Sequence, residues 1–244
     1  FTVEKVKFLI KTLAKLGMNV LMLYTEDTYE VEGQPYFGAY RGKYTKDEIK
    51  ELDAYASMFG VELVPCIQTL AHLHNVLKWP GMDKIRDSAD ILQPEKEETY
   101  QFIEKLLSSV KENFSTNRVH LGMDEAVMLG LGNYLKENGY KKGSLIIREH
   151  CNRVVDICRK LELKPMIWSD MYITANSTGG YYDLPENTDC SKWEKPKKDL
   201  GLVYWDYYHD DTRTYEKMLD IHAQLSDNVI FAGGSWIWNG ISPN

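Results

Sequence analysis

The stretch Val61-Glu-Leu-Val-Pro-Cys-Ile67 is a largely apolar run of strand length. It follows a helix pattern that begins at the capping box Thr45-Lys-Asp-Glu48 and ends at Gly60, since glycine suits the position just after a helix. A strand that is buried on both faces is typically a short continuous apolar run. This order of helix and strand therefore predicts a parallel sheet that is covered by helices.

The same alternation of helix and strand continues along the rest of the chain. Further helix patterns run through Val6–Leu16, from near Pro94 to Val110, through Leu145–Leu161, and from a cap at Thr212 to Leu225. Strands are predicted at Asn19–Tyr24, Val61–Ile67, Arg118–Met123, Lys164–Trp168, Gly201–Trp205 and Asn228–Ala232. This series predicts one α/β domain, built either as a (β/α) barrel or as a doubly wound sheet.

Composition excludes several classes of protein. The 244 residues are 43% hydrophobic and 27% charged, as in ordinary globular domains, and no apolar run approaches the roughly 18 residues of a membrane helix. The net charge of −7 argues against nucleic acid as a partner. The four cysteines are too irregularly spaced for a disulfide framework or a zinc site. The chain begins at Phe1 without a signal segment, which favours a cytoplasmic location, and its oligomeric state is not predicted.

Polar and aromatic residues gather where the predicted strands end, which is where barrel enzymes carry their chemistry. The segments concerned are Tyr24–Asp27, Gln68–His74, Asp124-Glu125, Trp168–Asp170, Tyr204–Tyr208 and Gly233–Trp238, and none contains Lys or Arg. Carboxylates, histidines and aromatic rings without cations favour a neutral polyhydroxy ligand over a phosphate.

The alternation of side chains along a strand predicts which of these residues share a face. The expected groups are His120 with Gly122 and Asp124, Trp168 with Asp170, Tyr204 with Asp206, and Trp236 with Trp238. Glu125 then falls at the strand exit, beside Asp124. Because adjacent carboxylates repel, we expect one of this pair to have a raised pKa, as a general acid requires. His72-x-His74 has no third ligand at a convincing spacing, so no metal is expected.

Several of these segments resemble one enzyme family. His120-Leu-Gly-Met-Asp124-Glu125 is similar to the His-x-Gly-Gly-Asp-Glu signature of glycoside hydrolase family 20, the β-N-acetylhexosaminidases, as a variant with Met123 for the second glycine. Pro65–His72 resembles the family's Pro-Glu-Ile-Asp-x-Pro-Gly-His segment and keeps its proline, isoleucine and histidine. Later matches are Trp168, Tyr204-Trp-Asp206 and Gly233-Gly-Ser-Trp-Ile-Trp238. The resemblance covers essentially the whole chain and implies a TIM barrel.

The resemblance also implies a reaction. An exo-acting, retaining enzyme would remove terminal β-linked N-acetylglucosamine or N-acetylgalactosamine from glycans, with the substrate's own 2-acetamido group as nucleophile. Glu125 would be acid and base, Asp124 would bind the acetamido N–H, and Tyr204 would donate to the acetamide oxygen, without a cofactor. Expected sugar-binding residues are Trp168, Asp206, Trp205, Trp236, Trp238, His72, His120 and Asp27. The alternatives are a chitinase, an O-GlcNAcase-like enzyme, or a catalytically silent saccharide-binding barrel.

The chain departs from the family at both ends. Family members usually carry an arginine at the end of the first barrel strand, and that strand would precede Phe1. The last helix and the eighth strand would follow Asn244. We therefore expect residues 1–244 to form a single catalytic domain that holds strands two to seven of a (β/α)8 TIM barrel, within a longer polypeptide.

Overall fold

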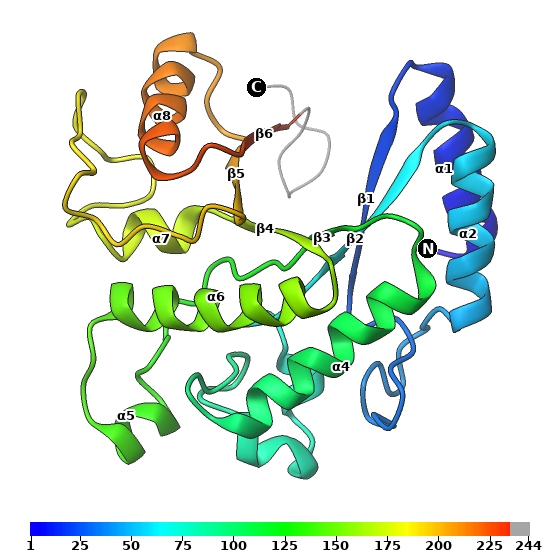
Figure 1. The fold of residues 1–244 in the computed structure, drawn as a ribbon, viewed down its shortest axis with the longest axis horizontal. Coiled ribbons are helices and arrows are strands. Elements are labelled where there is room, and N and C mark those ends of the chain that lie inside the picture. The colour runs from blue at the N-terminus through cyan, green and yellow to red at the C-terminus, as the bar shows by residue number, and fades with distance from the viewer. Residues whose placement is uncertain (235–244) are drawn as a thin grey trace.

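The computed structural model describes residues 1–234. Six strands lie in chain order, each parallel to the next, and curl into half of a barrel (Figure 1). They are β1 (Val20–Glu26), β2 (Glu62–Ile67), β3 (Arg118–His120), β4 (Lys164–Trp168), β5 (Gly201–Asp206) and β6 (Val229–Gly233). The predicted partial α/β barrel is confirmed.

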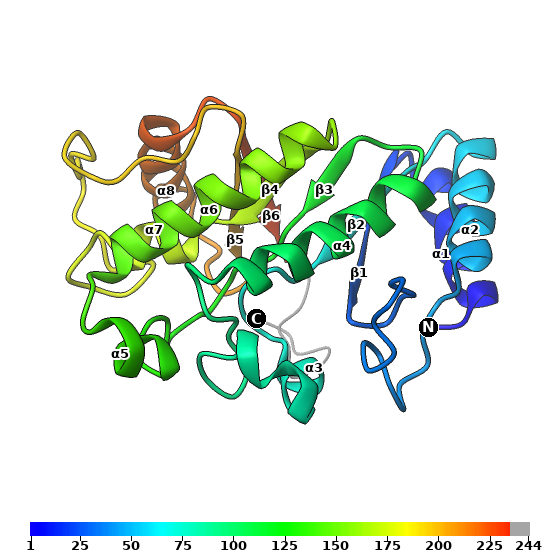
Figure 2. The same ribbon diagram turned by 60° about the horizontal axis from the view of Figure 1, so that its bottom comes forward.

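Helices cover the outer face of this sheet. The longer ones are α1 (Val3–Lys15), α2 (Lys46–Met58), α4 (Glu97–Asn113), α6 (Gly143–Lys160) and α8 (Thr212–Leu225). The shorter ones are α3 (His74–Leu77), η1 (Pro80–Ile85), α5 (Asn133–Asn138) and α7 (Asp170–Thr174). Helices α1 and α2 lie at the β1 end and α8 at the β6 end, while α4 packs against α6 between them (Figures 1 and 2). In the part of the chain that the structure describes, no helix is long and apolar enough to cross a membrane.

Helix starts follow local capping chemistry. The predicted capping box is present, because the Thr45 side chain accepts from the Glu48 backbone and the Glu48 side chain accepts from the Thr45 backbone. The predicted cap of α8 is wrong by one residue. Asp211 is the N-cap, since its carboxylate accepts from the Thr214 N–H at 2.8 Å, and Thr212 is the first helical residue.

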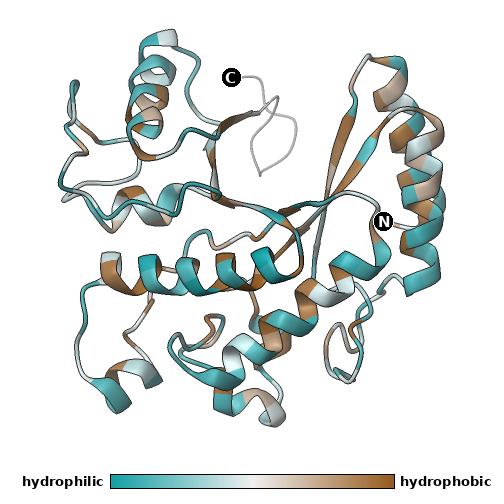
Figure 3. Cartoon of the chain, viewed as in Figure 1, coloured by the Kyte–Doolittle hydropathy of each residue, from teal (hydrophilic) through white to brown (hydrophobic). Residues whose placement is uncertain are grey.

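One face of the sheet packs against the helices, and the other lines the inside of the half-barrel. Strands are mostly hydrophobic, whereas the helices carry both hydrophobic and hydrophilic residues (Figure 3). Val119, Ile167 and Leu202 are fully buried in the core between the strands and the helices. Neighbouring residues in the register of a parallel sheet point the same way, and Trp168 is paired with Val203. Trp168 and Trp205 therefore share the inner face of the half-barrel.

The third strand is shorter than predicted. It ends at His120, and the next residues leave the extended conformation, with φ of 71° at Gly122 and 69° at Met123. A Cβ atom on Gly122 would lie 2.0 Å from Gln68 Oε1, so this close approach requires glycine. The predicted alternation therefore does not extend to Asp124. It also fails at Asp170, which is the first residue of α7.

Candidate active site

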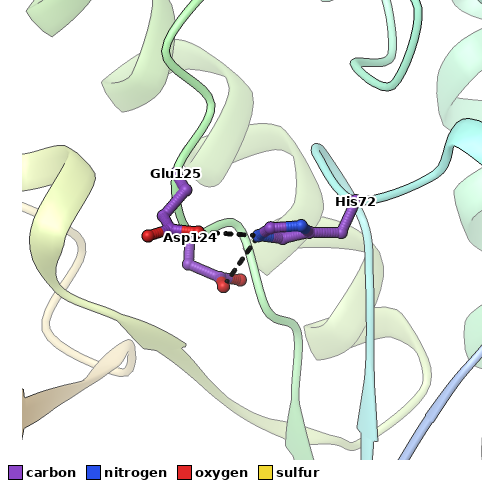
Figure 4. A group of neighbouring side chains, drawn as sticks. All are labelled: His72, Asp124 and Glu125. Carbon is purple, nitrogen blue, oxygen red and sulfur yellow. Dashed lines mark ion pairs between the residues drawn. The ribbon is translucent and has the colours of Figure 1, made fainter. Parts of the chain in front are cut away.

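Three polar side chains meet beyond the carboxyl ends of β2 and β3. His72 lies in the loop after β2, and Asp124 and Glu125 lie in the loop after β3 (Figure 4). The His72 Nε2 atom is 3.0 Å from Asp124 Oδ2 and 3.5 Å from Glu125 Oε2. The Glu125 side chain is 58% exposed, whereas that of Asp124 is 20% exposed. The cluster therefore presents one accessible carboxyl group beside a more enclosed one.

Two residues of the cluster, His72 and Glu125, have unusual backbone conformations that orient their side chains. Both His72 and Glu125 have positive φ, 57° and 52°, in the left-handed region that side chains rarely adopt. Such conformations persist only where surrounding contacts enforce them, and they concentrate at functional sites. For Glu125 the enforcing contact is its backbone N–H, which donates to Asp170 Oδ2 at 2.8 Å.

Charge organises the cluster as an ion pair. The hydrogen-bonding contact with Asp124 raises the pKa of His72 to about 9, despite opposition from burial. Burial raises the pKa of Asp124, but contacts from His72 and Gln68 outweigh it and hold that pKa below its usual range. At neutral pH a protonated His72 therefore faces an ionised Asp124. The sequence predicts that repulsion raises the pKa of one member of the acid pair, whereas the pKa of Asp124 is lowered.

Asp170 is the carboxyl group whose pKa rises. Its side chain is buried and accepts from the Glu125 backbone and from Trp205 Nε1, the latter at 3.4 Å. Burial raises its pKa to about 7. The sequence placed Asp170 at a strand end but gave it no role, although its position after Trp168 was the available signal.

We expect Asp170 to make stability depend on pH. Its pKa is about 7 in the folded protein against an ordinary value of 3.8, so the folded state holds a proton that the unfolded chain releases first. This contribution to the free energy of unfolding is complete below about pH 3.8 and is lost as pH rises through 7. Urea unfolding of wild type and Asp170→Asn should therefore diverge between those values. Identical pH profiles would contradict the assignment.

His120 and Trp168 pack together under the cluster. Their ring centroids are 4.4 Å apart, and His120 Nδ1 accepts from the Gly122 N–H at 3.0 Å. Burial lowers the pKa of His120 to about 4, so this ring is neutral at pH 7. His120 has no exposed surface, so a predicted contact with sugar could only be indirect. Trp168 is only partly buried.

Further aromatic side chains lie next to Trp168 on the inner face of the half-barrel. Trp205 stacks on Tyr181 at a centroid distance of 5.1 Å and on Tyr207 at 5.7 Å. Tyr207 is half-buried, and burial together with the charge of Asp124 raises its pKa to about 12. Trp168 and Trp205 thus occupy positions from which they could wall a ligand. The other two predicted aromatics, Trp236 and Trp238, lie outside the described residues.

Two predicted site residues of β5 point the other way. Tyr204 is fully buried, and its ring lies 5.1 Å from that of His222 on α8. The Tyr204 hydroxyl donates to Asp206 Oδ2 at 2.7 Å, and His209 Nδ1 lies 2.9 Å from the same oxygen. The shared face of Tyr204 and Asp206 was predicted correctly, but it is the face that meets the helices, so the expected approach of Tyr204 to a ligand is not what the structure shows.

Asp27 is likewise enclosed. It is 1% exposed and forms an ion pair with Arg41, which also binds Glu26 Oε1 at 2.5 Å. Within residues 1–234 the carboxyl ends of the strands carry no Lys or Arg of their own, but the loop after β1 brings Arg41 to the end of that strand. This arginine was missed because its loop position follows no strand pattern. Its charge is engaged by two carboxylates.

The same three-residue cluster offers ligand atoms that a metal could use. One atom each from His72, Asp124 and Glu125 lie within 4.8 Å of one another. A metal would need unprotonated His72, whereas the ion pair with Asp124 favours the protonated ring. We assign no metal to the cluster, and the absence of a metal requirement stays a prediction.

Comparison with known proteins places these residues in a family. The model of glycosyl hydrolase family 20, catalytic domain, matches residues 1–207. This chain belongs to glycosyl hydrolase family 20. Hexosaminidase D from Bos taurus is 28% identical over 91% of the chain and 62% of its own length, and hexosaminidase D from Homo sapiens is 26% identical over 86% and 41%. The family 20 chain thus spans less than two thirds of these curated relatives.

Solved structures agree on the fold. A family 20 exo-β-N-acetylglucosaminidase from Vibrio harveyi superposes with a TM-score of 0.71 at 20% identity, covering 95% of this chain and 39% of that one. A family 20 β-N-acetylhexosaminidase from Streptomyces coelicolor gives a TM-score of 0.70 at 17% identity, covering 96% and 45%. The six-stranded half-barrel is therefore a family 20 fold.

Proposed function

We propose that this chain is the catalytic part of an exo-acting β-N-acetylhexosaminidase that works by retaining, substrate-assisted hydrolysis. The observation that carries the proposal is the cluster of His72, Asp124 and Glu125 at the carboxyl ends of parallel strands. An accessible carboxyl group stands there beside an ionised, enclosed one, next to aromatic side chains. The substrates would be glycans that end in a β-linked N-acetylhexosamine.

The proposed reaction has two steps. In the first, the acetamide oxygen attacks the anomeric carbon while the glycosidic bond breaks and Glu125 gives its proton to the departing oxygen. Asp124 accepts from the acetamido N–H and stabilises the positive charge of the oxazolinium ion. In the second step Glu125 takes a proton from water, and the water oxygen attacks the anomeric carbon. This attack opens the oxazolinium ring and restores the acetamido group. His72 holds Asp124 ionised throughout.

We assign the hydroxyl that meets the acetamide oxygen to Tyr207 rather than to the predicted Tyr204. Tyr207 stacks on Trp205, on the inner face of the half-barrel, and burial together with the charge of Asp124 raises its pKa. The Tyr204 hydroxyl is engaged with Asp206 on the opposite face. The family motif matches at Tyr204, but the stacking of Tyr207 on Trp205 and its nearness to Asp124 favour Tyr207, three residues later.

A pair of matched variants tests this assignment. Tyr207→Phe should lower kcat by about 10–100-fold, the value of a hydrogen bond to a charged group. Tyr204→Phe removes the same atom from a buried pair, so its loss should be seen in the free energy of unfolding, with kcat nearly unchanged. Steady-state kinetics and urea titration of both variants measure this. A larger loss of kcat in Tyr204→Phe would return the role to Tyr204.

The function itself is decided by substrate choice. Purified protein should hydrolyse a chromogenic β-N-acetylglucosaminide, release the β-anomer first, and leave the corresponding non-acetylated β-glucoside intact. Equal rates on both substrates would overturn the substrate-assisted route. Internal cleavage of a chitin oligosaccharide would favour a chitinase, and binding without turnover would indicate a silent saccharide-binding barrel.

A further inference from the structure

Gln68 is a buried side chain in contact with Asp124. It follows β2, is 1% exposed, and its Nε2 donates to Asp124 Oδ1 at 2.9 Å. Its Oε1 accepts from the Met123 backbone N–H at 3.2 Å. A backbone N–H can only donate, so it fixes which end of the amide is oxygen and leaves the NH2 group for Asp124. Both ends of Gln68 are thus engaged around the acid pair.

The surrounding chain is shaped to admit this amide. Gly122 has a φ of 71°, and a Cβ atom there would lie 2.0 Å from Gln68 Oε1 and 2.5 Å from its amide carbon. Thr69, the next residue, donates through its hydroxyl to the Leu121 carbonyl at 2.9 Å, which fastens the Gln68 segment to the chain leading into Asp124. The conformation of the Gln68 side chain is therefore fixed by its surroundings, unlike that of a side chain on the surface.

The position also carries different chemistry from the family pattern that the sequence resembles. Pro65–His72 matches Pro-Glu-Ile-Asp-x-Pro-Gly-His, so Gln68 stands where that pattern has aspartate. A carboxylate there could accept but not donate, and beside Asp124 it would require a shared proton. The neutral amide donates without taking up a proton.

We propose that Gln68 is a positioning residue that orients Asp124 and keeps it ionised, so that Asp124 needs no shared proton with a second carboxyl group. Gln68 fixes Oδ1 and His72 contacts Oδ2, which sets the plane of the carboxylate from two sides. Each oxygen keeps further acceptor capacity for a ligand N–H. This role rests on the proposed function, since Asp124 acts there on the acetamido group.

Other titratable groups also influence Asp124 or lie against it, and all are present in both forms compared below. They are His72 and Glu125 in the cluster, Tyr24 from β1, Cys66 from β2, His120 from β3, Asp170 from α7, and Tyr207 after β5. A change confined to residue 68 therefore reports its own contribution.

Gln68→Glu is the decisive variant because it keeps the shape and replaces the donating NH2 with an oxygen. We expect the acid limb of the kcat/KM pH profile to move up by about one pH unit or more, and kcat at pH 7 to fall about tenfold or more. Gln68→Asn keeps an amide but is too short for both contacts, so it should lower kcat and move that limb up by less than Gln68→Glu does, because it adds no second carboxyl group. Gln101→Glu, the same change on the exposed side of α4, should alter neither quantity.

A measurement without turnover separates this proposal from the function. NMR titration of a protein labelled at the aspartate carboxyl carbons should give a higher Asp124 pKa in Gln68→Glu than in wild type, whether or not the protein hydrolyses glycosides. That result with an inactive wild type would overturn the function and leave the role of Gln68 in setting the Asp124 charge. An unchanged Asp124 pKa and pH profile in a folded Gln68→Glu would overturn the Gln68 proposal alone.

Discussion

Glu125→Gln is expected to lower kcat on a chromogenic β-N-acetylglucosaminide by about 10²–10⁴-fold, the usual contribution of a positioned general acid and base. KM should change little, because the amide keeps the shape of the side chain. The His72–Asp124 ion pair, at 3.0 Å, does not depend on Glu125 and should survive. Stopped-assay kinetics across pH would measure the loss.

The leaving group makes this test sharper. A dinitrophenyl glycoside releases dinitrophenolate, a weak base that leaves with little protonation. In the first step Glu125→Gln should therefore lose far less activity on this substrate than on an alkyl glycoside. Glu98→Gln, an equal change at an exposed position on α4, serves as the control and should behave as wild type. If the variant loses the same factor on both substrates, Glu125 is not the general acid.

Asp124→Asn is expected to lower kcat by about 10²–10³-fold, since it removes the charge that would stabilise the oxazolinium ion. The same change deprives His72 of its main partner, so the His72 pKa should fall from about 9 toward its ordinary 6.5. Kinetics measure the first effect, and an NMR titration of the imidazole measures the second.

The two readouts of Asp124→Asn have separate meanings. The His72 contribution to the free energy of unfolding is complete below about pH 6.5 and is lost as pH rises through 9, so the variant should be less stable than wild type mainly below that window. Asp220→Asn, on the exposed side of α8, is the control. A normal kcat with a shifted His72 pKa would limit Asp124 to a structural role.

The strands and the acid pair were predictable because their signals are local. Buried parallel strands are apolar runs whatever their neighbours, so Lys164–Trp168 was predicted with the bounds that the structure gives. The end of β3 was not predictable, because the left-handed turn at Gly122 and Met123 depends on the close approach of Gln68, which lies in the loop after β2.

The direction of the β5 side chains needed the assembled sheet. Motif similarity selects Tyr204, and alternation adds that Asp206 lies on the same side. Neither says which side is inward, because that depends on the pairing of Trp168 with Val203 and on the packing of Tyr204 against α8. The role of Asp170 was not predictable for a similar reason, since its side chain accepts a hydrogen bond from the backbone N–H of Glu125, 45 residues earlier in the chain.

The shortness of β3 gives the half-barrel a seam. Within the described residues, β2 and β3 share a single register pair, Cys66 with His120. Beyond that pair, Thr69 and Gln68 hydrogen-bond to the segment that follows β3. The hydrogen bond that orients Asp124 thus also holds the segment after β2 to the segment after β3. Any substitution at Gln68 or Asp124 acts on both, so rate and unfolding must be measured on the same preparation before a loss of turnover is read as chemistry.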